Sequence, residues 1–335
     1  MHQVATQLPE YEVAFSPYYS DGFLDFAKKA GLLEWTILGK KWVKRSSDYL
    51  KDHNLPIDYQ GKLHAYDLVV TCQDLIIPKN IQGRKIVLVQ EGMTDPETLL
   101  FRLVRALPFV PRWIAGTSTT GLSDQYDRFC VASEGYRDLF VQKGVQPEKI
   151  KVTGIPNFDN CRKFLDNDFP HRHFVLVCTS DSRETFAYEN RKRFIEKAVQ
   201  IAAGRQLIFK LHPNENVERA TREINRYAPG ALVYQSSKAE EMVANCDVLI
   251  TRYSTTVYVG MALGKEVHSD FNLEQLKRLL PAQNGLAASN IANVCRELLG
   301  QEVASSVPVR CRWDHPFGVD KALQTISKSV TTEVE

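Results

Sequence analysis

The sequence lacks the short motifs by which many nucleotide-binding and metal-dependent enzymes can be identified at once. It contains no G-x-x-x-x-G-K-[ST], G-x-G-x-x-G, H-E-x-x-H or G-x-S-x-G pattern, which excludes P-loop, dinucleotide, zinc-protease and nucleophile-elbow sites of the usual form. The seven cysteines include no C-x-x-C pair, and several lie within apolar runs. We therefore predict reduced, buried cysteines and no metal site.

Long apolar runs and an excess of one charge are missing as well. No run approaches the roughly 20 residues that span a bilayer, the first residues, MHQVATQLPE, do not form a signal peptide, and the formal net charge is +2. We therefore expect a cytoplasmic protein with no nucleic-acid partner. The basic, apolar segment LLFRLVRALPFVPRWI could make peripheral contact with the inner face of a membrane; an amphipathic helix packed on a sheet is the alternative.

What the sequence does contain is a regular alternation of β-rich and helical segments. The β-rich runs are apolar on successive residues, as in parallel strands that are covered on both faces. Helical patterns at 134–144, 189–204 and 217–228 separate several of them. This alternation predicts an α/β protein with two doubly wound, Rossmann-like domains facing a cleft. The predicted strands are residues 11–19, 66–72, 85–90, 128–133, 149–155, 173–180, 205–212, 231–235 and 246–254.

The predicted domain boundary lies in the polar segment 158–172. We assign residues 1–163 to the first domain and 164–335 to the second, with the last helix able to pack back on the first domain. Such domains open with a strand, a glycine-rich turn and a helix, whereas residues 11–19 have the pattern of a second strand. We therefore expect the first strand to be missing from this sequence, which mass spectrometry of the natural N-terminus would test.

Ligands of open α/β sheets bind beyond the carboxyl ends of the strands, and the second domain has phosphate-binding residue types at three such places. In the segment KLHPNEN, Lys210, His212 and Asn214 lie at the end of a strand that Pro213 terminates. Lysine and histidine can both donate hydrogen bonds to phosphate oxygens. A buried histidine bonded to a backbone carbonyl is the competing interpretation of His212.

The other two places combine hydroxyl groups with an arginine. The strand DVLIT runs into Arg252, Ser254, Thr255 and Thr256, and a helix follows. Ser254 or Thr255 would cap that helix, whose amide-rich N-terminus suits a diphosphate. After the strand FVLVC, an exposed loop is the alternative to a phosphate or sugar site, and the candidates there are Thr179, Ser180 and Arg183.

The first domain offers candidates for the acceptor side of a reaction. Glu91 follows the strand KIVLVQ, and Gly92 comes next. A carboxylate at a strand end, enclosed by protein, is a candidate general base. A glutamate that caps a turn or pairs with Arg112 is the alternative. Asp21, after residues 11–19, is a further acceptor-side candidate.

The order of these segments resembles the GT-B superfamily. EGM, VTGIPNFD, KLHPNEN, DVLITRYSTTVYVGMALGKEV and WDHPFGVDKALQTI follow one another as in UDP-N-acetylglucosamine 2-epimerase-like proteins and the capsule or CDP-glycerol-type transferases of bacteria. The resemblance implies that His212 and Pro213, and the segment 254–256, contact the donor phosphate. It also places residues 315–318 just before a closing helix.

Two departures separate this chain from the epimerases. They carry a Ser-Gly-Gly turn where this chain has Ser254, Thr255 and Thr256. Their His-Arg-x-Glu-Asn loop is matched only loosely, by residues 182–184 and 189–190. The pattern is therefore closer to that of a transferase.

The resemblance implies a metal-independent glycosyltransferase of GT-B type in bacterial surface polysaccharide synthesis. It would transfer a sugar from a nucleotide-activated donor to a glycan or lipid-linked acceptor. The donor is a substrate, so no cofactor is expected; UDP is the first choice of nucleotide, with CDP and CMP as alternatives. The rival interpretations are a non-hydrolysing 2-epimerase-like enzyme and a catalytically degenerate GT-B protein that acts as a binding subunit.

Overall fold

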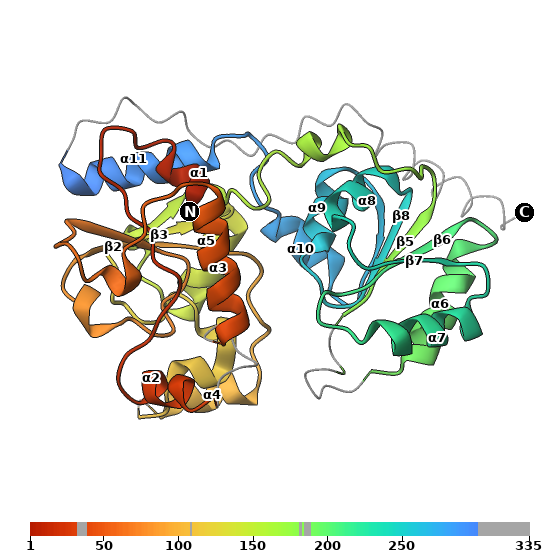
Figure 1. The fold of residues 1–335 in the computed structure, drawn as a ribbon, viewed down its shortest axis with the longest axis horizontal. Coiled ribbons are helices and arrows are strands. Elements are labelled where there is room, and N and C mark those ends of the chain that lie inside the picture. The colour runs from red at the N-terminus through yellow and green to blue at the C-terminus, as the bar shows by residue number, and fades with distance from the viewer. Residues whose placement is uncertain (32–38, 108, 181–182, 184–188, 301–335) are drawn as a thin grey trace, which may run out of the picture. The chain divides into compact units, whose positions relative to one another are not determined.

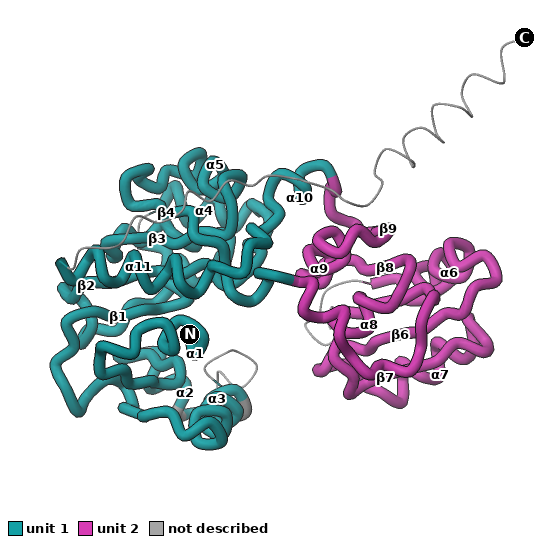
Figure 2. Tube along the Cα trace, turned by 90° about the horizontal axis from the view of Figure 1, so that it is seen from above, with its two compact units in different colours: residues 1–160, 274–307 teal, residues 161–273, 308–335 magenta. Residues whose placement is uncertain are grey.

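The computed structural model describes residues 1–31, 39–107, 109–180, 183 and 189–300, and all structural statements below refer to these residues. The chain divides into two compact units, drawn in different colours in Figure 2. Unit 1 consists of Met1–Asn160 and the segment that begins at Glu274, and the described part of unit 2 is Cys161–Leu273. The chain thus returns to the first unit at Glu274.

Unit 1 is built on a four-stranded parallel sheet with the order β1-β2-β3-β4 (Figure 1). Its strands are β1 (Leu68–Thr71), β2 (Lys85–Val89), β3 (Arg128–Val131) and β4 (Ile150–Val152). The helices of this part of the chain are α1 (His2–Ala5), α2 (Gly22–Lys29), α3 (Lys40–Asp52), α4 (Leu99–Ala106), α5 (Glu134–Lys143), α10 (Leu273–Leu279) and α11 (Ala287–Leu299). Short 3-10 segments are η1 (Tyr59–Gly61), η2 (Lys79–Ile81), η3 (Arg112–Thr119) and η4 (Pro147–Lys149). Helix α5 contacts β3 and β4, and α11 contacts β2, which explains why the middle strands are buried.

The returning segment is held against unit 1 at the start of α5. Ser133 Oγ donates a hydrogen bond to the Leu279 carbonyl at 3.1 Å. A Cβ atom on Gly135 would lie 1.9 Å from the carbonyl oxygen of Arg278. Glycine is therefore required at this position, because the two backbones approach too closely for any side chain.

Unit 2 contains a five-stranded parallel sheet with the order β7-β6-β5-β8-β9. Every residue of β5, β6 and β8 is buried, which explains their continuous apolar sequences. Val175, Phe209 and Ile250 share a core with residues of α6 and α7. The strands are β5 (Val175–Cys178), β6 (Leu207–Lys210), β7 (Leu232–Tyr234), β8 (Val248–Thr251) and β9 (Glu266–His268). The helical segments are η5 (Cys161–Leu165), α6 (Arg191–Ala202), α7 (Val217–Tyr227), α8 (Ala239–Asn245) and α9 (Thr256–Ala262).

The predicted alternation is confirmed from residue 66 onward, where each predicted strand and helix is present. The strand predicted at 11–19 is wrong, because only Phe15 forms an isolated bridge, with Ile57. Pro17 has no N–H group to donate to a ladder, which limits pairing in this segment. The helix expected after residues 315–318 lies outside the described residues. None of the helices described is long and apolar enough to cross a membrane.

Candidate functional site

The sheet of unit 2 changes its winding direction at β5, and open α/β sheets bind ligands at such a switch point. From β5 the chain proceeds to β6 and β7 on one side, then crosses back to β8 and β9 on the other. Cys178 pairs in register with both Lys210 and Thr251, so the carboxyl ends of β5, β6 and β8 are level. The residues that follow these three strands therefore share the edge at which a ligand of this fold binds.

Thr179 and His212 meet at this edge, as predicted for neighbouring strand ends. The amide of His212 donates to Thr179 Oγ1 at 3.0 Å and to the Glu215 carboxylate at 3.3 Å. The amide of Asn214 donates to His212 Nδ1 at 3.3 Å, so the proton of the neutral ring belongs on Nε2. The half-buried imidazole can then donate from Nε2 to an oxyanion, whereas the exposed Asn214 side chain lies at the rim.

Glu215 connects several residues at this edge, and it was not among the site residues predicted from the sequence. Its buried carboxylate accepts hydrogen bonds from the Thr179 hydroxyl and from Arg191, in addition to the His212 amide. Arg191 is itself only 4% exposed and lies 3.2 Å from Glu189. A buried carboxylate needs such partners because desolvation of an unpaired charge is costly. Glu215 therefore holds the ends of β5 and β6 and the start of α6 together.

A second carboxylate in this network, Glu189, is buried but poorly satisfied. Neither of its oxygens has a hydrogen-bond partner within the described part of the chain, and burial raises the pKa of its carboxyl group. Arg191, Arg252 and Arg183 oppose that rise through their charges. Within the described residues, Glu189 is thus paired in charge with Arg191 but accepts no hydrogen bond.

Arg183, predicted to bind phosphate, instead pairs with the carboxylate of Glu223. Its two terminal nitrogens each lie 2.9 Å from an oxygen of Glu223. The neighbouring Ser180 is half-buried, and its carbonyl oxygen lies 3.5 Å from Arg191. Residues 182 and 184 of the loop that resembles the epimerases lie outside the described residues.

The hydroxyl-rich segment after β8 lies on the other side of the β5 end. Thr256 lies near the thiol of Cys178, the last residue of β5, and burial raises the pKa of this thiol to about 12. Ser254 Oγ accepts the amide of Thr256 at 3.3 Å and its hydroxyl at 3.0 Å. Thr255 occupies the N-cap position of α9 but makes no side-chain capping bond. The end of β5 therefore has His212, which follows β6, on one side and the segment that follows β8 and leads to Thr256 on the other.

Two predicted cations at this edge already have protein partners. The buried ammonium of Lys210 donates to the carbonyls of Leu211 and Gln235, both at 2.9 Å, and burial lowers its pKa. Arg252 Nε donates to Asp270 at 2.8 Å. These bonds use two of the three N–H donors of Lys210 and one of the five of Arg252.

The predicted base in unit 1 lies at the end of β2. The Glu91 side chain reaches solvent, yet the surrounding protein desolvates its carboxyl group enough to raise its pKa, which the terminal ammonium of Met1 partly opposes. Arg112, the alternative partner named above, instead pairs with the buried Asp74 at 3.2 Å. Glu91 is therefore available as a carboxylate whose proton affinity exceeds that of an ordinary glutamate.

The other two acceptor-side candidates, Gly92 and Asp21, form hydrogen bonds within unit 1. The Gly92 carbonyl accepts a hydrogen bond from Gln90 Nε2 at 2.7 Å. Asp21 lies at the start of α2 and accepts the amide of Lys79 at 2.6 Å. Within the described ranges, no three His, Cys, Asp or Glu side chains lie close enough together to hold a metal ion.

Comparison with known proteins places this geometry in a known fold. No protein-family model matches the sequence, and no curated protein matches it. A solved UDP-N-acetylglucosamine 2-epimerase aligns over 91% of this chain and 95% of its own, with a TM-score of 0.51 and 11% identity. The S. aureus MnaA–UDP co-structure aligns over 91% and 87%, with a TM-score of 0.53 and 11% identity. The fold is therefore of the GT-B type, with two Rossmann-like units, as the sequence predicted.

A weaker similarity involves a polymerase. The wall teichoic acid polymerase TagF aligns over 67% of this chain and 65% of its own, with a TM-score of 0.38 and 12% identity. Similarity at this level does not distinguish one activity from another. The comparisons thus establish the fold, and the chemistry has to be argued from the side chains.

If Glu215 organises the switch-point edge, Glu215→Ala will weaken unit 2 locally. The substitution leaves Arg191 buried with one acid fewer, and breaking a buried ion pair costs about 3–5 kcal/mol. Hydrogen exchange of the β5 and β6 amides under native conditions measures this loss. The control Glu196→Ala removes an exposed carboxylate 3.7 Å from Lys192 and should cost less than about 1 kcal/mol. Equal effects of the two substitutions would contradict the assignment.

Proposed function

We propose that this protein is a glycosyltransferase of GT-B type that uses a nucleotide-activated sugar, with UDP as the nucleotide. One observation carries the proposal: side chains that can donate to phosphate follow the strands on both sides of β5 at the switch point of unit 2. They are His212 after β6 and Ser254 after β8. The Thr179 hydroxyl after β5 positions His212, because it donates to Glu215 and accepts the His212 amide, and the Thr256 hydroxyl donates to Ser254. Two solved structures with TM-scores above 0.5 are named for UDP-N-acetylglucosamine or UDP, which supports a UDP-sugar as the donor.

The proposed donor site stabilises the leaving group. When the acceptor oxygen bonds to the anomeric carbon, the bond from that carbon to the diphosphate breaks and negative charge develops on the diphosphate. The His212 Nε2–H group and the Ser254 hydroxyl would donate hydrogen bonds to that charge. Donors that are held in place before the reaction are worth most in the transition state, so the proposed reaction requires no metal.

Glu91 is the proposed general base, which takes the proton of the acceptor hydroxyl. Only its deprotonated form can do so. Because its pKa is raised, the carboxylate is lost as pH falls through that raised value, and kcat/KM should decline on the acid side at a higher pH than for an ordinary glutamate.

An epimerase acting on the same donor is the second candidate, since an epimerase shares the fold over 91% of this chain. Incubation with UDP-N-acetylglucosamine separates the two. A transferase releases UDP only when a glycan or lipid-linked acceptor is present, whereas an epimerase yields the epimerised nucleotide sugar without one. Tight UDP binding with no turnover on any acceptor would instead indicate a binding subunit.

Two substitutions test nucleotide binding by unit 2 and base catalysis by unit 1 separately. His212→Ala removes a charge-assisted contact and should weaken UDP binding about 10- to 100-fold. Glu91→Gln should leave UDP binding intact and lower kcat about 100- to 10,000-fold. The control Glu97→Gln, an exposed acid in the same loop, should change neither. UDP affinity unaffected by His212→Ala would overturn the phosphate assignment.

We further propose that unit 1 contacts an anionic membrane when it takes a lipid-linked acceptor. Helix α4 packs its inner face, Phe101 and Val104, against Ala115 of η3. Its outer face and the following segment leave six large apolar side chains exposed, including Leu99 and Phe109, each 80% exposed. The others are Leu100, Leu103, Trp113 and Ile114.

The charge of this segment fits the same partner. Residues 98–123 contain arginines but no Asp or Glu, and Arg102 and Arg105 are exposed. A helix with one apolar face and flanking cations lies in the interface of an anionic bilayer, where each cation near the surface contributes about 1 kcal/mol. An apolar patch of this kind marks an interaction site rather than ordinary surface.

Co-sedimentation with vesicles of phosphatidylcholine and phosphatidylglycerol in equal parts tests the membrane contact. The wild-type protein should sediment with these vesicles, less so at high salt, and Leu99→Ser/Phe109→Ser should remain in the supernatant. The control Tyr59→Ser/Leu63→Ser removes two exposed apolar side chains of unit 1 outside this face and should behave like the wild type. Failure of the wild type to bind, or equal failure of the control, would rule the contact out.

A further inference from the structure

A basic pocket lies between α6 and α7 of unit 2. It is open to solvent, has a volume of about 420 Å³ and is lined by seven residues, five of them cationic and only Glu223 acidic. The cations are Arg191, Lys192, Arg219, Arg222 and Arg226, and Tyr227 completes the lining. A volume of this size suits a small molecule.

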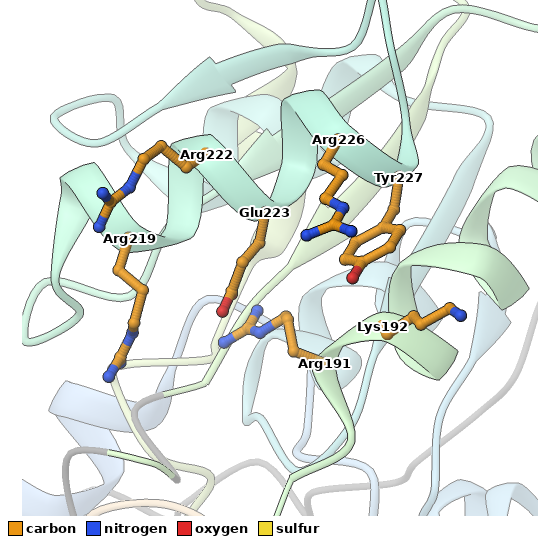
Figure 3. Close-up of a pocket in the computed structure, with 7 residues that line it drawn as sticks. All are labelled: Arg191, Lys192, Arg219, Arg222, Glu223, Arg226 and Tyr227. Atoms are coloured by element: carbon orange, nitrogen blue, oxygen red, sulfur yellow. The ribbon is translucent and has the colours of Figure 1, made fainter.

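The side chains of α7 converge on this pocket. Figure 3 shows Arg219, Glu223 and Arg226 directed from α7 to the same side, toward the start of α6 that carries Arg191. Arg219, Glu223 and Arg226 lie three or four residues apart along one helix, so they share one face. The Arg226 guanidinium also lies 5.4 Å from the ring centre of Tyr227.

The charges in the pocket are only partly balanced. Glu223 is already bound through both oxygens by Arg183. Lys192 approaches Glu196 at 3.7 Å, but both side chains are exposed, and such pairs are weak. Among the described residues, Arg222 and Arg226 form no salt bridge. Like charges placed on one helix face repel one another, so an anion in the pocket would relieve that repulsion.

Arg191 adds a second, independent observation. It is 4% exposed and uses Nη2 to bind Glu215 and Glu189. Its Nε and Nη1 atoms are buried and have no hydrogen-bond partner among the described residues. Buried guanidinium donors are normally satisfied, and Arg191 lines the pocket. Two of its donor atoms are therefore unsatisfied by the described residues.

We propose that this pocket is a second anion site, which binds a small phosphorylated molecule independently of the nucleotide at the switch point. Guanidinium groups match the oxygens of phosphate in paired hydrogen bonds. Several of them around one cavity favour a ligand with more than one negative charge. The Tyr227 ring offers an apolar wall for the part of the ligand that carries the phosphate.

Titration calorimetry with inorganic pyrophosphate tests the proposal on the full-length protein. Arg219→Gln/Arg226→Gln should weaken pyrophosphate binding about tenfold or more, because two charge-assisted contacts are lost. The control Arg193→Gln/Lys197→Gln removes the same charge from exposed positions of α6 outside the pocket and should leave the affinity within about twofold of wild type. Arg226→Gln alone, the mildest change, should give an intermediate loss.

A further variant separates this site from the switch-point edge. His212→Ala should retain pyrophosphate binding that is sensitive to Arg219→Gln/Arg226→Gln. The proposal is overturned if the wild type does not bind pyrophosphate, if the pocket and control variants bind alike, or if His212→Ala alone abolishes the binding.

Discussion

The buried carboxylate of Glu215 is the interaction on which the candidate site of unit 2 depends. Parallel strands end at one edge, where backbone and side-chain polar groups lose their ladder partners and must be satisfied in other ways. Glu215 accepts the Thr179 hydroxyl, the His212 amide and the Arg191 guanidinium, and so ties two strand ends to the start of α6. Glu215 therefore holds His212 and Thr179 in place at the switch point.

The same network connects two regions of different chemistry. At the switch point, the His212 imidazole and the Ser254 hydroxyl are short donors, which suit a diphosphate that must leave during a reaction. On the α6–α7 side, arginines dominate, which suits an anion that stays bound. Arg191 bonds to Glu215 and lines the pocket, and Glu223 of the pocket bonds to Arg183 of the loop beside the switch point. Glu215 therefore bonds directly to a residue of each region, to His212 at the switch point and to Arg191 at the pocket.

Much of the fold could be predicted from the sequence. Parallel strands that are buried on both faces are continuous apolar runs, and such runs are visible in the sequence. Residues 11–19 misled that analysis, since aromatic and apolar residues there pack without forming a ladder. Within the site, Thr179, His212 and Thr256 could be placed by the rule that ligands bind at strand ends. Glu215 could not, because its partners Thr179 and Arg191 lie 36 and 24 residues away and only the fold brings them together. Lys210 has a residue type suited to phosphate, but its ammonium is bonded to two carbonyls that the sequence does not reveal.

Amide hydrogen exchange with and without UDP tests the central claim most directly. If the switch-point edge of unit 2 binds the nucleotide diphosphate, UDP will slow exchange in residues 211–216 and 252–258 and leave α4 unchanged. Slowed exchange confined to unit 1, or to α6 and α7 alone, would contradict the claim, because the nucleotide would then bind away from the strand ends that Glu215 organises.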